Sequence, residues 1–291
     1  MDSGHATSRI LVAGCGYLGL ALCQRFAGDG RRVWALRRSA AATDELARAG
    51  AVPLIADLTR PETLASLPPL DAVVACQAPG RNDEDRATYI DGTRHLIEAM
   101  IAHPPSRFVF VSSTSVYGHT GGEWVDETTP PRSSSARART LLDAEVVACT
   151  APWPTMVVRL AGLYGPGRDR TQLLRSGRVS AADRGYVNHI HVDDAAGIIA
   201  LVLERGEPGQ VYLGVDERPV ERSVCYAWIA QRAGIAPPAT GATAPRELGS
   251  KRCSNRKVAT LGYRYRYPDY QAGFGALIAA PSQQTGSRRD G

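Results

Sequence analysis

Short runs of consecutive apolar residues recur along the first 160 residues of the chain, with longer mixed segments between them. Six runs of four to six residues show little alternation of apolar and polar positions: 10–13, 33–36, 52–56, 72–76, 108–111 and 155–160. A strand without alternation is buried on both faces, which is typical of a parallel sheet covered by helices. These six runs are therefore predicted to be buried parallel strands.

The segments between the runs predict the connecting helices, at residues 18–26, 43–49, 86–102 and 137–148. Gly28 and Gly30 after the first of these segments, and Gly50 after the second, are typical helix stops. Beyond residue 160 a Gly- and Pro-rich segment comes first, and then a further helix at 191–203 and a seventh strand at 210–215. This order predicts an α/β fold with a Rossmann-type doubly wound parallel sheet.

Composition narrows the class of protein. The chain has 291 residues, of which 44% are hydrophobic and 22% charged, as in a globular domain rather than a disordered or fibrous chain. No uncharged apolar run approaches the roughly 20 residues of a membrane span, and the polar start does not resemble a signal peptide. We expect a cytoplasmic protein without a membrane partner. The six cysteines contain no C-x-x-C pair, so disulfides and a metal site are not expected.

The net charge of +5 raises nucleic acid as a partner. However, the arginines are spread along the chain, and no basic run is interleaved with aromatic residues. We therefore expect no nucleic-acid partner and attribute the charge to a general abundance of arginine.

A glycine motif follows the first predicted strand. Gly14, Gly16 and Gly19 form G-x-G-x-x-G, with Tyr17 and Leu18 between the last two glycines. This pattern between a strand and a helix is the dinucleotide-binding fingerprint: the glycines allow a tight turn, close approach of a pyrophosphate and tight helix–strand packing. The N-terminus of the helix favours the phosphate charge.

The end of the second predicted strand indicates which dinucleotide binds. An NAD site usually has an acidic residue there for the ribose 2′-hydroxyl, whereas this chain has Arg37 and Arg38. Two guanidinium groups match a 2′-phosphate, so NADP is favoured over NAD. The alternative is that the two arginines are a solvated surface pair without a role in binding. Asp57 and Leu58 follow the third predicted strand and are candidate cofactor-binding residues. The Asp57 carboxylate could accept a hydrogen bond from the adenine amino group, or it could instead cap its own loop.

Four segments together resemble the extended short-chain dehydrogenase/reductase superfamily, in its NAD-dependent epimerase/dehydratase group. They are the glycine motif, Val111-Ser-Ser-Thr-Ser-Val-Tyr-Gly118, Arg159-Leu-Ala-Gly-Leu-Tyr-Gly-Pro-Gly-Arg168 and Asn188-His-Ile-His-Val-Asp-Asp194. The resemblance implies a Rossmann domain at 1–165, to which 188–215 returns, and a smaller substrate domain formed by 166–187 and 216–280. Residues 281–291 are expected to be a disordered tail.

The resemblance also assigns roles to particular residues. Ser113 falls on the catalytic Ser/Thr, which hydrogen-bonds the reacting carbonyl or hydroxyl group. Thr114 and Ser115 fall in the substrate site, where dehydratases have an acidic pair that hydroxyl groups cannot replace. By analogy, three further residues lie near the substrate: Tyr164, His189 and Arg252. We expect the His189 and His191 rings to point to opposite sides of a strand and to be packing residues.

The family's Tyr-x-x-x-Lys pair is missing. With Glu145 as the anchor, Arg137 takes the place of the tyrosine and Leu141 that of the lysine, and no Tyr lies between 117 and 164. Arginine cannot act as a general acid, although Arg137 or Arg139 could replace the lysine charge. Proton donors that remain open are Ser113 through water, Tyr117, Tyr164 and Tyr186.

Two functions remain open. The first is an atypical NADP-dependent oxidoreductase or epimerase-like enzyme acting on a small carbonyl or nucleotide-sugar-type substrate. The alternative is a non-catalytic NADP-binding redox sensor or regulatory protein, which the missing pair favours. Many relatives dimerise through the helices predicted at 86–102 and 136–149, so the resemblance also implies a homodimer.

Overall fold

The computed structural model describes residues 8–80, 83–133, 135–175, 184–238 and 249–279. Seven of its strands form one parallel sheet: β1 (Arg9–Ala13), β2 (Arg32–Arg37), β3 (Ala51–Ile55), β4 (Ala72–Ala75), β5 (Arg107–Ser113), β7 (Thr155–Leu160) and β11 (Val211–Gly214). Their order is β11-β7-β5-β4-β1-β2-β3. All seven predicted strands are present, and the predicted Rossmann-type fold is confirmed.

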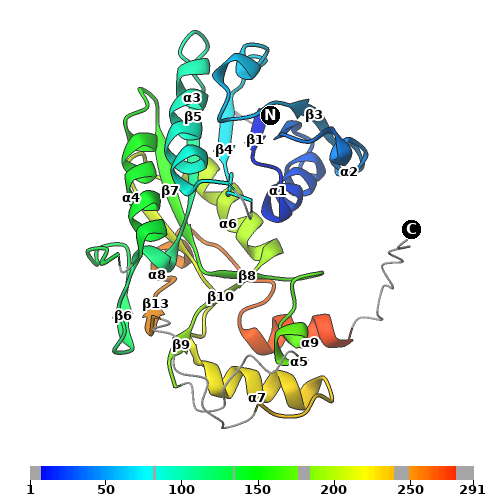
Figure 1. Ribbon diagram of the computed structural model, residues 1–291, viewed down its shortest axis with the longest axis vertical. Helices are drawn as coiled ribbons and strands as arrows, with labels where there is room; N and C mark the ends of the chain where they lie inside the picture. The colour runs from blue at the N-terminus through cyan, green and yellow to red at the C-terminus, as the bar shows by residue number, and fades with distance from the viewer. Residues whose placement is uncertain (1–7, 81–82, 134, 176–183, 239–248, 280–291) are drawn as a thin grey trace.

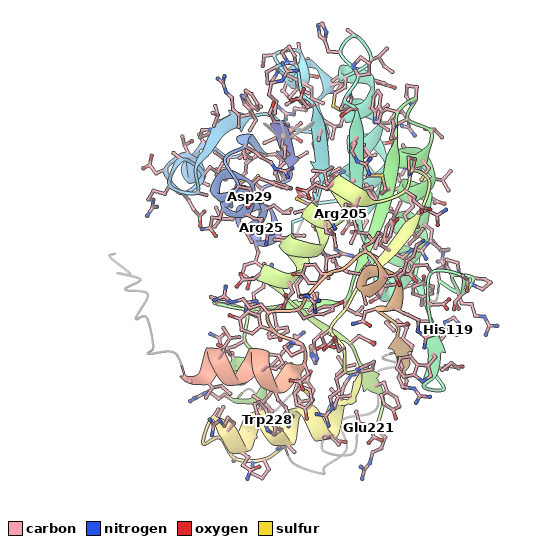
Figure 2. The ribbon with its side chains drawn as sticks, turned by 180° about the vertical axis from the view of Figure 1, so that it is seen from behind. Arg25, Asp29, His119, Arg205, Glu221 and Trp228 are labelled. Carbon is pink, nitrogen blue, oxygen red and sulfur yellow. The ribbon has the colours of Figure 1, made fainter. Side chains whose placement is uncertain are left out.

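Helices cover both faces of the sheet (Figure 1). On one face α3 (Gly92–Ala99) packs against α4 (Ala136–Cys149), and on the other α1 (Tyr17–Gly28) packs against α6 (Val192–Arg205). Figure 2 shows the molecule from behind. Arg25 and Asp29, at the C-terminal end of α1, lie there on the same face of the sheet as Arg205, the last residue of α6. The short helix α2 (Thr43–Arg48) packs on β3 at the sheet edge.

The order of the strands reverses beside β1. From β1 the chain moves outward through β2 and β3, and then crosses to β4 on the other side of β1. In open α/β sheets the crevice at such a reversal, outside the carboxyl ends of the strands, is the usual ligand site. The fold therefore provides a crevice where β1 and β4 end.

The helix predicted over 86–102 is shorter and less regular than expected. It begins with a π-helical turn, Ala87–Asp91, and continues as α3 only to Ala99. Pro104 and Pro105 follow closely, and a proline disfavours helical backbone in the residue before it, which opposes extension of the helix. The π-helical turn contains the buried Tyr89.

The remaining elements lie mostly below the carboxyl ends of the sheet strands. They are β6 (Glu123–Val125), β8 (Gly162–Tyr164), α5 (Thr171–Arg175), β9 (Tyr186–Val187), β10 (His189–His191), β12 (Val220–Glu221), α7 (Arg222–Arg232), β13 (Lys251–Cys253), α8 (Arg256–Thr260) and α9 (Tyr270–Ala279). Short 3-10 turns lie at Ala40–Ala42, Pro61–Leu64 and Thr114–Val116.

A second, smaller hydrophobic core holds the lower elements together, separate from the core around the sheet. In it α5, α7 and α9 pack around Tyr164 and Phe274, and the Trp228 ring of α7 meets the Tyr270 ring of α9 edge-on. Trp228 and Glu221 are labelled in this lower part in Figure 2. Within the described residues, no helix combines the length and the apolar character that crossing a bilayer requires.

Candidate nucleotide-binding and active site

One cavity of about 590 Å³ occupies the crevice at the carboxyl ends of the central strands. At one end its wall is formed by the glycine turn and the residues after β2 and β3. At the other end the wall reaches the last residues of β5 and β7, together with α4 and the segment after β8. The cavity therefore connects the predicted dinucleotide site with Ser113.

The glycine turn has the geometry that a pyrophosphate site requires. Gly14 has a φ of +91°, and a Cβ on it would lie 2.4 Å from the Cα atom of Gln77. A Cβ on Gly19 would lie 2.9 Å from the Gly14 carbonyl oxygen, so this glycine allows close helix–strand packing. A Cβ on Gly16 would meet nothing within 4 Å, although Gly16 lines the cavity. The free space at Gly16 is where a ligand would approach the backbone.

Tyr17 and Leu18, the first residues of α1, also line the cavity. The Arg168 guanidinium carbon lies 4.5 Å from the centre of the Tyr17 ring. The Tyr17 hydroxyl is buried and has no hydrogen-bond partner in the described structure, and burial raises its pKa to about 12. Arg168 is also on the cavity wall and adds positive charge at this end of α1.

Arg37 and Arg38 both lie on the cavity wall where β2 ends, as predicted from the sequence. Each faces an acidic residue. The Arg38 guanidinium donates two hydrogen bonds to Asp83, at 2.6 and 3.1 Å, and Arg37 lies 3.5 Å from Glu45. The side chains are 38% exposed for Arg37 and 53% for Arg38, so both remain accessible to a ligand.

Asp57 and Leu58 follow β3 and line the same end of the cavity. Asp57 Oδ1 accepts hydrogen bonds from the backbone N–H and the hydroxyl of Thr59, at 2.9 and 2.8 Å. Asp57 therefore caps its own loop, which was one of the two roles expected for it. The carboxylate also lies on the cavity wall, so contact with an adenine group remains a prediction.

Ser113 ends β5 and lines the cavity together with Ser112, while Thr114 and Ser115 do not. Its Oγ atom accepts a hydrogen bond of 3.1 Å from the backbone N–H of Ser115 and is the cap of the 3-10 turn that follows. Thr114 is buried, and Ser115 is exposed to solvent outside the cavity wall. Of the three residues, Ser113 is the one placed to reach a ligand in this cavity.

The α4 helix brings Leu141 to the cavity wall at the position where the family resemblance places a lysine. One turn earlier, Arg137 Nη2 donates a hydrogen bond of 3.0 Å to the hydroxyl of Tyr89. Tyr89 lines the cavity as well. The helix contains neither Tyr nor Lys. A tyrosine and a cation therefore meet beside the cavity, but they come from two different segments.

The other tyrosines considered as proton donors lie outside the cavity wall. Tyr117 is fully buried, its hydroxyl donates to the Asp126 carbonyl at 2.9 Å, and burial raises its pKa to about 12. Tyr164 is also fully buried, against Phe274 of α9, and its pKa is raised by burial. Tyr186 lies on β9, where the guanidinium carbon of Arg252 is 5.0 Å from its ring centre.

His189 and Arg252 do not line this cavity either, and their contact with substrate remains a prediction. The expectation that His189 and His191 point to opposite sides is wrong: both rings meet Tyr164 edge-on, at 5.8 and 5.2 Å. Residues two apart on a strand share a face, which explains this arrangement.

Among the described residues, no group of three His, Cys, Asp or Glu side chains could hold a metal ion.

The cavity also contains residues that the sequence analysis missed: Gln77, Tyr89, Leu163 and, although it ends a quoted motif, Arg168. Gln77 Nε2 donates to Thr93, while its buried Oε1 has no partner in the described structure. Gln77 follows β4, and a polar residue directly after a buried strand could have been recognised as a site residue from the sequence.

Comparison with known proteins agrees with this geometry. The chain matches the NAD-dependent epimerase/dehydratase family over residues 10–213, which cover all but the two outermost residues of the sheet and every residue that lines the cavity. It therefore belongs to this family, as the sequence motifs indicated.

Two relatives resemble nearly the whole chain. Protein YeeZ of Escherichia coli K12 is 29% identical over 273 residues, which cover 90% of this chain and 97% of YeeZ. The structure of an epimerase/dehydratase-like protein from Methylobacillus flagellatus is 38% identical, with a TM-score of 0.78 and coverage of 94% and 98%. DesIV, a dTDP-glucose 4,6-dehydratase of Streptomyces venezuelae with NAD bound, shares the fold with a TM-score of 0.80 at 21% identity, over 93% of this chain and 95% of DesIV.

Proposed function

We propose that this protein is an NADP-dependent oxidoreductase that acts on a small carbonyl compound or a nucleotide-sugar-type substrate. The observation that carries the proposal is the position of two arginines, Arg37 and Arg38, in the same cavity as the glycine turn and Ser113. A 2′-phosphate beside β2 would meet two guanidinium groups and no carboxylate on the strand itself.

The residues present fit a dinucleotide. Gly16 leaves the approach to the backbone open, and the N-terminus of the twelve-residue α1 faces the cavity. The unpartnered Oε1 of Gln77 offers an acceptor for a ribose hydroxyl. When bound, the reduced nicotinamide would supply a hydride to the substrate. Ser113 would donate a hydrogen bond to the oxygen that gains negative charge.

The competing proposal, a non-catalytic NADP-binding redox sensor, draws its support from α4, which contains neither Tyr nor Lys. Both proposals require NADP binding, but only the enzyme requires turnover. The two therefore differ in what Ser113→Ala should do: it should slow an enzyme and leave a sensor unaffected.

Calorimetric titration with NADPH and NADH tests the shared part of both proposals. We expect tighter binding of NADPH, and we expect this preference to move toward NADH in the double variant Arg37→Asp with Arg38→Ala. An unchanged preference would contradict the NADP assignment. Oxidation of NADPH in the presence of a panel of aldehydes, ketones and nucleotide sugars then separates enzyme from sensor.

A further inference from the structure

Tyr89 and Arg137 form a contact that neither the glycine motif nor the family resemblance predicts. Arg137 Nη2 donates to the Tyr89 hydroxyl oxygen at 3.0 Å, and the guanidinium carbon lies 5.7 Å from the ring centre. Arg137 Nη1 also lies 3.6 Å from the Asp85 carboxylate. Asp85 and the hydroxyl therefore hold the guanidinium from two sides, at the point where the π-helical turn packs against α4.

Tyr89 lines the cavity and contacts the first turn of α4, the helix that brings Leu141 to the cavity. It is 6% exposed, and Ser113 and Leu160 line the same cavity. The other tyrosine on the cavity wall in the described structure is Tyr17, at the glycine turn. Arg168 covers the ring of Tyr17 rather than its hydroxyl, which has no hydrogen-bond partner among the described residues. Of the two, Tyr89 has the hydroxyl that a cation contacts directly.

We propose that the Tyr89 hydroxyl, held by Arg137, is the proton donor that replaces the missing tyrosine and lysine of α4. The carbonyl carbon of the substrate would receive a hydride, with its two electrons, from a reduced nicotinamide. The π electron pair of the C=O bond moves to the oxygen, which takes the proton from Tyr89 as the O–H bond breaks. Water then returns a proton to the phenolate through the cavity, and Arg137 balances the negative charge in between.

The surroundings of Tyr89 suit a donor. Burial raises the pKa of its hydroxyl, Arg137 lowers it, and Asp85 raises it slightly, for a net increase. Tyr89 is therefore a neutral phenol at neutral pH and holds the proton that reduction requires. The Arg137 side chain is 54% exposed, so solvent screens its charge, and its main effect comes through the direct hydrogen bond to the oxygen.

This inference rests on the proposed function, and its test does not need the natural substrate. With ¹³Cζ-tyrosine incorporated into the full chain, the Tyr89 signal is assigned as the one lost in Tyr89→Phe. The pH titration of that signal is then measured twice, once with saturating NADP⁺ and once with saturating 2′-phospho-ADP-ribose, which lacks nicotinamide. The two titration curves are compared. A phenol facing the positively charged ring should titrate about one pH unit lower with NADP⁺. Arg137→Met should raise the pKa of Tyr89, and Arg137→Lys should restore part of the difference.

Each outcome decides a different proposal. Equal titration curves with the two ligands would overturn the inference, because the hydroxyl would then not face the nicotinamide. Failure of both ligands to bind would instead overturn the proposed NADP site, and the inference with it. Tyr186→Phe is the control for the assignment, since Tyr186 lies on β9 outside the cavity wall and its loss should leave the Tyr89 signal unchanged.

Discussion

Arg159 and Glu145 form a two-bond ion pair in the interior, with Nη2–Oε2 at 2.6 Å and Nε–Oε1 at 2.9 Å. The two side chains are only 6% and 8% exposed. The Ser112 hydroxyl donates to the same carboxylate, and Arg159 donates in turn to the Tyr117 hydroxyl. Since Glu145 belongs to α4 and Arg159 to β7, this pair fixes the position of α4 on the sheet. The part of α4 that faces the cavity depends on it.

Breaking the pair should destabilise the fold strongly. In Glu145→Gln the Arg159 guanidinium would be left buried without a countercharge, and we expect a loss of about 3–5 kcal/mol in the free energy of unfolding. Urea denaturation followed by circular dichroism measures this loss. The double variant Glu145→Met with Arg159→Met should lose less free energy of unfolding than the sum for the single variants Glu145→Met and Arg159→Met, because it leaves no unpaired charge. Additive losses would show that the pair contributes little as a pair.

Asp83 should weaken the binding of NADPH. Asp83 lies on the cavity wall, and its carboxylate accepts from both terminal nitrogens of Arg38. These hydrogen bonds keep the pKa of Asp83 below its usual range. In Asp83→Asn the Arg38 charge becomes free for a 2′-phosphate and a repulsive charge disappears. We expect NADPH to bind severalfold more tightly by calorimetry, while NADH, which lacks the phosphate, is the internal control and should be unaffected. An equal gain for both cofactors would place the phosphate elsewhere.

Ser113→Ala should slow turnover without weakening NADPH binding. Loss of one donor to a developing oxyanion typically costs about 10²- to 10³-fold in rate. The variant also loses the cap to the Ser115 backbone N–H, so its unfolding should be measured alongside. Ser106→Ala is the matched control, because Ser106 precedes the other end of β5, outside the cavity wall, and its hydroxyl donates to the backbone carbonyl of Asp71. Equal, measurable NADPH-oxidation rates for Ser113→Ala and the wild type would show that Ser113 is not the donor, whereas tight NADPH binding without any oxidation by the wild type would favour the sensor.

The sequence predicts the features that depend on local pattern and not those that depend on pairing over distance. The seven strands and the glycine turn follow from runs of neighbouring residues, and the structure contains them. The bonds from Arg137 to Tyr89 and from Arg38 to Asp83 join residues 48 and 45 positions apart. These contacts exist only once helices and loops have packed, so no local pattern reveals them.

Two glycines of the turn should respond differently to the same substitution. At Gly14 an alanine needs a positive φ and would collide with the Gln77 backbone, so Gly14→Ala should cost more than about 1 kcal/mol in stability. At Gly16 the added methyl group meets no protein atom within 4 Å. Gly16→Ala should therefore fold with an unchanged melting temperature and lose affinity for NADPH. Normal NADPH binding by Gly16→Ala would contradict the placement of the pyrophosphate.

His189 should make the fold sensitive to mild acid. Its ring is buried and meets the rings of Tyr164 and Phe274 edge-on. Neither ring nitrogen has a partner in the described structure, and burial lowers the pKa of the ring to about 3. In the unfolded chain a histidine titrates near 6.5, so between about pH 6.5 and 3 the unfolded state binds the extra proton. The free energy of unfolding should therefore fall as the pH is lowered through this window, by up to about 1.4 kcal/mol per pH unit from this group.

His189→Phe keeps a ring in the aromatic cluster and removes both unpartnered nitrogens. We expect its stability at pH 7.5 to match or exceed that of the wild type, and its loss of stability between pH 7.5 and 5 to be smaller. Burial also lowers the pKa of His191, so part of the acid sensitivity should remain. Urea denaturation at the two pH values measures both effects. If the variant loses as much stability as the wild type over this interval, His189 is not the group whose protonation opposes folding.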